Sequence, residues 1–331
     1  MINPKQKLSD KIFKKTVDQI PTRQGYGDGL VIAGEADEQV VVLCADLTDS
    51  TKSALFKEKF PERFIEVGVA EQGMATLAAG MANYGKVPFI SSYAAFSPGR
   101  NWEQIRTTIA LNDVPVKIAG AHTGVSVGPD GATHQMLEDI ALMRAMPNMI
   151  VISPADAIEA RKATMAAAEN GKPTYLRFAR EKTPVFTTDK TPFKVGRAEI
   201  FWESKGPEAV IIACGPLVYE ALLAAKELDK KGVQTLVVNC HTIKPIDEQT
   251  IVKAAKITGA VVTVEEHQVN GGLGGAVAEV LSKNFPVPME FIGMPDSFGE
   301  SGDPDELLTK YGMKRDDIMK AVLKVIKRKN E

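Results

Sequence analysis

Three short segments in the first half of the sequence combine side chains that can take part in chemistry. They read FIEVGVAEQ at 64–72, SSYAAF at 91–96 and HTGVSVGPDGATHQ at 122–135. Singly, each side chain has an ordinary explanation, because an acidic residue in a first helical turn favours the helix dipole and aromatic residues usually pack in cores. The side chains concerned are Glu71, Tyr93, Phe96, His122, Asp130 and His134.

Each of these segments follows or includes a predicted strand. Between the apolar runs lie amphipathic segments with apolar residues three and four apart, which predict helices. This succession predicts crossover units on a parallel sheet, and such sheets bind ligands at the carboxyl ends of their strands. We therefore expect the three segments to form one functional site. The predicted strands are Gln39–Ala45, Val87–Ser92, Val114–Ala121, Met149–Ser153 and Thr174–Phe178, and the predicted helices are Glu71–Asn83, Trp102–Leu111, Gln135–Ala145 and Asp156–Glu169.

The pattern breaks at Glu181–Pro192 (EKTPVFTTDKTP), which has no apolar period and is typical of a linker. It then restarts, so we expect an α/β protein with two doubly wound parallel-sheet domains, at residues 1–190 and 191–331. The later strands are predicted at Ala209–Ala213, Thr235–Asn239 and Ala260–Val264, and the later helices at Leu217–Lys230, Asp247–Ile257, Gly274–Leu281 and Asp316–Arg328.

Composition excludes several classes of protein. The chain has 331 residues, which suits two domains, and its 40 basic and 42 acidic side chains leave a net charge of −2. That balance argues against a nucleic-acid-binding protein, and no apolar run is long enough for a membrane helix. The N-terminus lacks the apolar core of a secretion signal. Since Cys44, Cys214 and Cys240 are odd in number and far apart, we expect no disulfide framework and a cytoplasmic location.

Two other patterns are interpreted as structural. Residues 271–275 (GGLGG) lie between a predicted strand and a predicted helix, but they lack the spacing of a dinucleotide fingerprint and the Lys-Ser/Thr of a phosphate loop. We expect a tight turn packed against a neighbour. The histidines show no metal-ligand spacing, so no metal site is predicted within this chain.

Over nearly its whole length the sequence resembles the transketolase family. The resemblance rests on VGVAEQ at 67–72, SSYAAF at 91–96, GPDGATHQ with MRAMPNM within 128–149, and EEHQVNGGLGGAVAEVL at 265–281. It implies a pyrimidine-binding domain followed by a transketolase C-terminal domain. The domain that precedes these two in full-length transketolases has no counterpart in this sequence. The chain therefore resembles the C-terminal section of a split transketolase.

The resemblance implies a thiamine diphosphate site. Glu71 matches the glutamate that hydrogen-bonds the aminopyrimidine of the cofactor, and Tyr93 and Phe96 match the aromatic residues that hold the pyrimidine ring. Asp46 and Leu47 match residues that line the same pocket. Family members usually have Phe where this chain has Tyr93.

The resemblance also implies a sugar-phosphate site and a reaction. His134 matches a histidine near the reacting hydroxyls of the donor, and Asp130 matches a carboxylate that binds a sugar hydroxyl. The expected activity is transfer of a two-carbon ketol unit from a ketose phosphate to an aldose phosphate. The phosphate itself is expected to bind Arg23, Ser50, His122 and Arg180.

A partner chain follows from the same resemblance. Gly27-Asp28-Gly29 matches the start of the magnesium fingerprint of thiamine diphosphate enzymes, but no Asn follows between Asp28 and Asn83, so we interpret it as coincidence. Mg²⁺ and the diphosphate are expected on an N-terminal subunit that carries the true GDG…N motif. We expect this chain to be inactive alone, to self-associate as a dimer and to form a heterotetramer with two copies of each chain.

Three alternatives stay open. The C-terminal half of deoxyxylulose-phosphate synthase and the β subunit of 2-oxoacid dehydrogenase E1 share parts of these motifs. An interaction protein with the same fold that has lost catalysis is the non-enzyme alternative. The presence of both Glu71 and His134 argues against that last reading.

Overall fold

The larger sheet of the molecule has seven strands. The computed structural model describes all residues, 1–331. The strand order is β12-β6-β7-β5-β4-β2-β3, and every neighbouring pair is parallel except β12 with β6. The strands are β2 (Val40–Cys44), β3 (Phe64–Glu66), β4 (Val87–Tyr93), β5 (Lys117–Ala121), β6 (Ile150–Ile152), β7 (Thr174–Arg177) and β12 (Thr242–Lys244).

The smaller sheet has five strands in the order β14-β13-β10-β11-β9, of which only β9 is antiparallel to its neighbour. A separate pair, β1 (Gln19–Pro21) and β8 (Lys182–Pro184), is antiparallel. The prediction of two α/β domains with mainly parallel sheets is thus confirmed. The strands of the smaller sheet are β9 (Glu199–Glu203), β10 (Ala209–Ala213), β11 (Thr235–Asn239), β13 (Val261–Gln268) and β14 (Met289–Met294).

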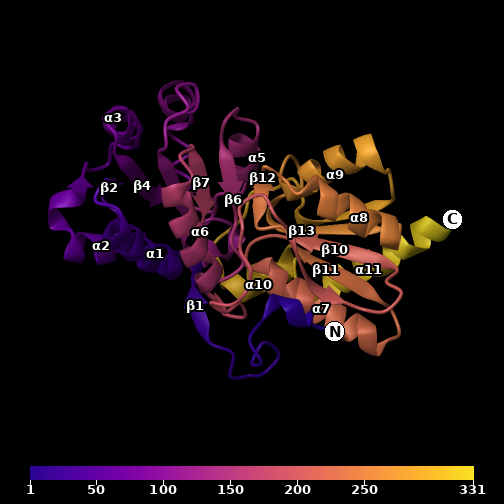
Figure 1. The fold of residues 1–331 in the computed structure, drawn as a ribbon. Coiled ribbons are helices and arrows are strands. Elements are labelled where there is room, and N and C mark those ends of the chain that lie inside the picture. The colour runs from indigo at the N-terminus through magenta and orange to yellow at the C-terminus, as the bar shows by residue number, and fades with distance from the viewer.

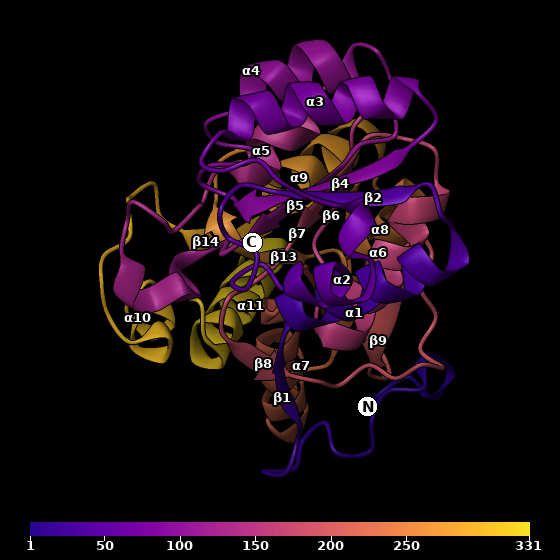
Figure 2. The same cartoon turned by 90° about the vertical axis from the view of Figure 1, so that its left-hand side faces the viewer.

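Helices cover both faces of the larger sheet (Figure 2). One face carries α1 (Thr22–Ala36), α2 (Ala54–Lys59) and α6 (Ala157–Glu169), whose first turn is capped by the Asp156 side chain. The other face carries the remaining helical segments of the first half, where the stretch 102–110 is α-helical and then π-helical. These segments are α3 (Glu71–Asn83), α4 (Trp102–Gln104), η3 (Ile105–Ala110) and α5 (Asp139–Arg144).

The smaller sheet is covered in the same way. Apolar side chains of α7 (Leu217–Lys230) and α11 (Arg315–Asn330) pack on one face, and those of α8 (Glu248–Thr258) and α9 (Leu273–Asn284) pack on the other. Asp247 caps the start of α8 and Asp303 caps the start of α10 (Pro304–Lys310). Short 3₁₀ helices complete the fold at η1 (Pro4–Gln6), η2 (Pro61–Arg63) and η4 (Val125–Asp130).

The two halves of the chain lie side by side and exchange segments (Figure 1). Strand β12 comes from the second half but joins the larger sheet. The N-terminal segment packs on the second half, where Asn3 bonds to the Phe201 carbonyl and Ile12 is buried. The segment predicted as a linker contains strand β8, which pairs with β1, and the buried side chain of Phe186. It is therefore part of the packed fold. The division at residues 190 and 191 stays a prediction.

Several strand and helix bounds differ from the prediction, and two of the differences have a clear physical reason. Strand β5 begins at Lys117 instead of Val114, since Pro115 lacks the N–H that a central strand needs. Helix α5 begins at Asp139 instead of Gln135. The amide of Gln135 donates to carbonyls of the preceding loop, so that residue serves the loop and not the helix.

The two glycine patterns have structural roles in this fold. Gly27 and Gly29 lie inside α1, where a Cβ would come within 2.7 Å of the Lys52 carbonyl and within 2.7 Å of Thr164 respectively. In the GGLGG turn, the backbone N–H groups of Leu273 and Gly274 at the start of α9 donate to the buried Glu265 carboxylate. The turn therefore already binds an anionic group of the chain itself. No helix is both long and apolar enough to cross a membrane.

Candidate active site

The segments singled out from the sequence meet at the carboxyl edge of the larger sheet. The strands β7, β5, β4, β2 and β3 are consecutive neighbours and all parallel. Their carboxyl ends therefore lead, side by side, into the loops that carry the predicted site. Tyr93 ends β4, His122 follows β5, and Glu71 begins the helix that follows β3.

Glu71 is a buried carboxylate with one free oxygen. Its side chain is 2% exposed, and its Oε2 pairs with Arg100 Nη1 at 2.9 Å. Asn101 Nδ2 donates to the Glu71 carbonyl at 3.0 Å, which ties the segment after β4 to the first turn of α3. The other carboxylate oxygen, Oε1, accepts no hydrogen bond from the chain. Glu71 can thus take one further donor.

Four rings form a cluster beside this carboxylate. His122 stacks on Tyr93 with ring centroids 3.7 Å apart, and Tyr93 lies 6.0 Å from Phe96 in a nearly parallel orientation. His134 meets Phe96 edge-on at 5.5 Å. Its Nδ1 is 2.8 Å from the Thr133 hydroxyl, which leaves Nε2 free for a ligand. The Arg100 guanidinium lies 4.9 Å from the Phe96 ring centre and so links the cluster to Glu71.

Two arginines and a neutral histidine make the other side of the cluster. Arg23 donates to the Ser50 carbonyl at 2.7 Å, and Arg180 donates to the Val127 carbonyl and to Glu181. Burial and then the Arg180 charge lower the pKa of Arg23. Burial, followed by Arg23 and Arg180, lowers the pKa of His122 to about 3, so this imidazole is neutral.

Two buried polar atoms in this cluster lack partners. Neither Arg23 Nε nor His122 Nδ1 has a hydrogen-bond partner. Buried polar atoms usually have a hydrogen-bond partner. Two such atoms without partners, beside the Arg23 and Arg180 guanidiniums, indicate a place for an anionic ligand. His122 and Asp46 also have positive φ, 57° and 58°, each just after a strand end. Asp and His adopt this conformation more readily than most residues other than glycine, so it suits the sharp turns that follow these strands.

The remaining predicted site residues lie after β2 and at the end of η4. Asp46 and Leu47 follow β2, where the Asp46 N–H donates to Glu66. Asp130 ends η4 with an exposed side chain. Ser50 meets Arg23 through its carbonyl and keeps its hydroxyl free.

Sequence reasoning missed Arg100, Asn101 and Glu266. Arg100 neutralises Glu71 from 29 positions along the chain, and Glu266 accepts the Ser126 N–H from 140 positions away. No local pattern marks Arg100 or Asn101, and the motif that contains Glu266 gives no sign of its partner, because each residue acts on a segment that is distant in sequence. Only the order of the strands brings the partners together.

The comparisons with known proteins agree with this fold. Residues 18–185 match the family described as "Transketolase, pyrimidine binding domain", and residues 196–318 match "Transketolase, C-terminal domain". A protein of Methanocaldococcus jannaschii described as a transketolase C-terminal section is 44% identical over 309 residues, which cover 92% of this chain and 96% of the relative. The chain belongs to the transketolase family.

Two further relatives show how much of a transketolase the chain spans. Human transketolase is 36% identical over 310 residues, which are 93% of this chain but 49% of that protein. A solved split-gene transketolase, described as an inactive β4 tetramer, is 44% identical with a TM-score of 0.87, covering 94% of this chain and 99% of that one. The chain thus spans about half of a single-chain transketolase and nearly all of the matched split-gene chain.

Proposed function

We propose that this chain is the C-terminal subunit of a thiamine-diphosphate-dependent transketolase, which transfers a two-carbon ketol unit from a ketose phosphate to an aldose phosphate. The observation that carries the proposal is the convergence of Glu71, the ring cluster and two arginines at one sheet edge. A buried carboxylate, flat rings and paired cations suit a ligand set of one aromatic cofactor and one phosphorylated sugar.

The residues present fit the pyrimidine end of thiamine diphosphate. Glu71 has a buried carboxylate whose Oε1 is free for a polar ring atom. Tyr93 and Phe96 are only partly buried and are nearly parallel, so a third ring can pack on them. When bound, the cofactor supplies the nucleophilic carbon for ketol transfer, and the protein holds and orients it.

The diphosphate and Mg²⁺ belong, in this proposal, to a partner. No three His, Cys, Asp or Glu side chains gather into a possible metal site. Asp28 is exposed and accepts a hydrogen bond from Gln24 on the same helix, away from the ring cluster. Mg²⁺ needs clustered oxygen ligands, which an N-terminal subunit with a GDG…N motif would provide. Two copies of each chain would then form a cytoplasmic heterotetramer.

The cationic side of the cluster is proposed to bind the sugar phosphate. Arg23 and Arg180 offer charge-assisted donors, and the neutral His122 and the Ser50 hydroxyl can add hydrogen bonds. His134 is proposed to move a proton at a substrate hydroxyl through its free Nε2, because an imidazole nitrogen can act as a general acid or base within hydrogen-bond reach. Asp130 would bind another sugar hydroxyl, and Asp46 and Leu47 would line the cofactor pocket.

Reconstitution tests this proposal. The purified chain is assayed for ketol transfer from a ketose phosphate with thiamine diphosphate and Mg²⁺, first alone and then with an N-terminal chain carrying GDG…N. We expect activity only in the mixture. Activity of the chain alone would contradict the split-enzyme proposal. A mixture that consumes pyruvate but not ketose phosphates would favour the deoxyxylulose-phosphate synthase or 2-oxoacid dehydrogenase alternatives.

A further inference from the structure

Residues of the second half of the chain form hydrogen bonds with the loop that carries His122, Asp130 and His134. The Ser126 N–H, near the start of η4, donates to Glu266 Oε1 at 2.6 Å. Glu266 is 3% exposed and lies on β13 of the smaller sheet. The bond therefore crosses from one domain-sized half of the molecule to the other.

The fit between this carboxylate and the loop is close. A Cβ at Gly124 would lie 2.2 Å from Glu266 Oε1, and Gly124 has a φ of +85°. The Glu266 carbonyl in turn accepts from Arg177 Nη2 at 2.8 Å. Arg177 is itself paired with the buried Asp139. Glu266 thus has little freedom to move, which makes it a rigid support for the loop.

A second contact from the same half holds the far end of the loop. Gln135 Nε2 donates to the Glu300 carbonyl at 2.9 Å and also to the Val125 carbonyl at 3.0 Å. At Gly131 a Cβ would lie 2.6 Å from Ser301 Oγ. The loop is therefore held at Ser126 and at Gln135 by residues of the second half of the chain.

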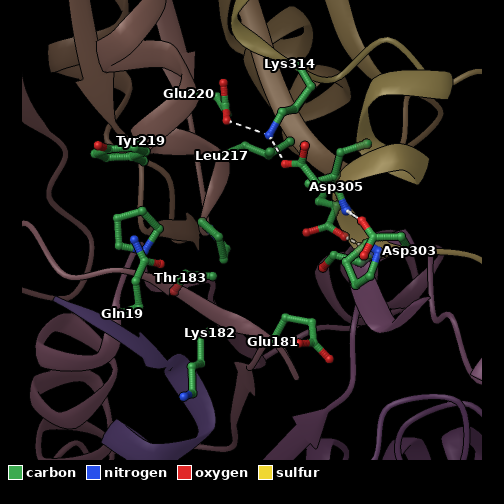
Figure 3. A pocket seen from close by; sticks show the side chains of 16 residues that line it. Gln19, Glu181, Lys182, Thr183, Leu217, Tyr219, Glu220, Asp303, Asp305 and Lys314 are labelled. Atoms are coloured by element: carbon green, nitrogen blue, oxygen red, sulfur yellow. Dashed lines mark hydrogen bonds and ion pairs between the residues drawn. The ribbon is translucent and has the colours of Figure 1, made fainter. Parts of the chain in front are cut away.

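Packing alone does not hold Ser126. Ser126 and Glu266 both line a cavity of about 470 Å³ between the two halves, and Figure 3 shows that charged residues such as Glu181, Lys182 and Lys314 surround it. Ser126 lies between the fully buried Val125 and Val127, and the hydrogen bond to Glu266 adds to their packing as a restraint on the loop. Water from the cavity could reach the Ser126 N–H if the carboxylate were removed, so such a variant is expected to fold.

We infer that Glu266 is a positioning residue, through which the C-terminal domain sets the placement of the substrate-binding loop. This inference rests on the proposed function for its kinetic consequence. The hydrogen bonds of Glu266 go to Ser126 and Arg177, and none goes to Glu71, the four rings, Arg23 or Arg180. It acts through Ser126, which lies four residues from Asp130 and four from His122 in the same loop. The C-terminal domain then contributes to the active site as well as to the fold.

The test compares Glu266→Ala with Glu266→Gln in the reconstituted complex. Glu266→Ala should raise the KM for a sugar phosphate about tenfold, the size expected for one lost hydrogen bond to a charged group. Affinity for thiamine diphosphate should change less than twofold, since Glu71, Tyr93 and Phe96 lie on other segments. Glu266→Gln keeps an acceptor oxygen and should stay within about threefold of the original KM.

Hydrogen exchange on the chain itself gives a readout that needs no reaction. Glu266→Ala should speed exchange in peptides covering residues 124–131 by about tenfold or more. Glu265→Gln is the control, because this adjacent buried carboxylate accepts backbone N–H groups at the start of α9 and lies beside His267, with no hydrogen bond to the loop at 122–135. Unchanged exchange in Glu266→Ala would overturn the inference even if the complex proved not to transfer ketol groups. Faster exchange with an unchanged KM, or Gln behaving like Ala, would overturn it as well.

Discussion

Arg100 Nη1 lies 2.9 Å from Glu71 Oε2 and joins an exposed arginine to a carboxylate that is almost fully buried. The arginine side chain is 48% exposed, whereas the glutamate side chain is 2% exposed. The pair satisfies one oxygen of Glu71 and leaves Oε1 unbonded. Removal of Glu71 would leave Arg100 in contact with water, so the fold should tolerate that change.

Glu71→Ala should therefore abolish turnover without unfolding the protein. We expect ketol transfer by the reconstituted complex to fall by about 10²–10⁴-fold, the range typical of groups that assist proton transfer. Steady-state rates and a thermal melt of the same preparation measure the two effects. Activity within tenfold of the original would remove Glu71 from the proposed mechanism. Arg106→Ala, on the neighbouring η3 segment, is a suitable control.

Arg180→Ala should weaken binding of phosphorylated substrates selectively. Arg180 belongs to the cluster in which Arg23 Nε and His122 Nδ1 lack partners. Loss of one charge-assisted contact is worth about 1.5–3 kcal/mol, or roughly ten- to a hundredfold in KM. KM for a ketose phosphate is compared with KM for hydroxypyruvate, which should change little. The control is Lys182→Ala, since Lys182 lines the cavity between the halves. An equal rise for both donors would make Arg180 structural.

Gly29→Ala should destabilise the chain because α1 packs closely on α6. A Cβ at Gly29 would lie 2.7 Å from Thr164 Cβ and 2.9 Å from the Arg161 carbonyl. Overpacking of this kind typically costs about 1–3 kcal/mol in the free energy of unfolding. Gly80→Ala on α3 is the matched control, since nothing lies within 4 Å of its added Cβ, and it should gain up to about 1 kcal/mol. Urea denaturation of the chain measures both, and equal effects would contradict the packing argument.

Lys117 should make stability depend on pH. Its ammonium is buried and donates to Asn170 and to the Lys172 carbonyl, and burial lowers its pKa to about 7. An unfolded lysine has a pKa of about 10.4. Between about pH 7 and 10 the unfolded chain therefore binds more protons, and the Lys117 contribution to the free energy of unfolding rises with pH.

Lys117→Met should remove this contribution. The free energy of unfolding of the variant minus that of the original chain should be largest below pH 7. This difference should fall as the pH rises toward 10, by up to about 1.4 kcal/mol per pH unit. Urea denaturation at pH 6.5 and 9.5 measures the difference. Lys172→Met, at a half-exposed lysine, is the control. A difference between variant and original that is the same at both pH values would contradict the prediction.

Local patterns in the sequence were enough to predict most strands and helices and the start of the site. The buried apolar runs VVVLC and AVIIA predicted β2 and β10, because each is short and rich in β-branched residues. The same patterns placed Glu71 in the first turn of α3 and Tyr93 at the end of β4. The glycine turn before α9 was also predictable, since it lacks the spacing that a phosphate loop requires.

The tertiary structure alone decided which distant residues complete the site. Glu66 holds the Asp46 N–H from a neighbouring strand, Arg100 neutralises Glu71, and Glu266 supports Ser126 from the other half of the chain. Strand β12 likewise joins the larger sheet by pairing with β6, a strand that lies far from it in the sequence. Periodicity reports which face of an element is buried, and it carries no information about which element lies opposite. That information comes from the order and register of the strands, which depend on contacts across the whole chain.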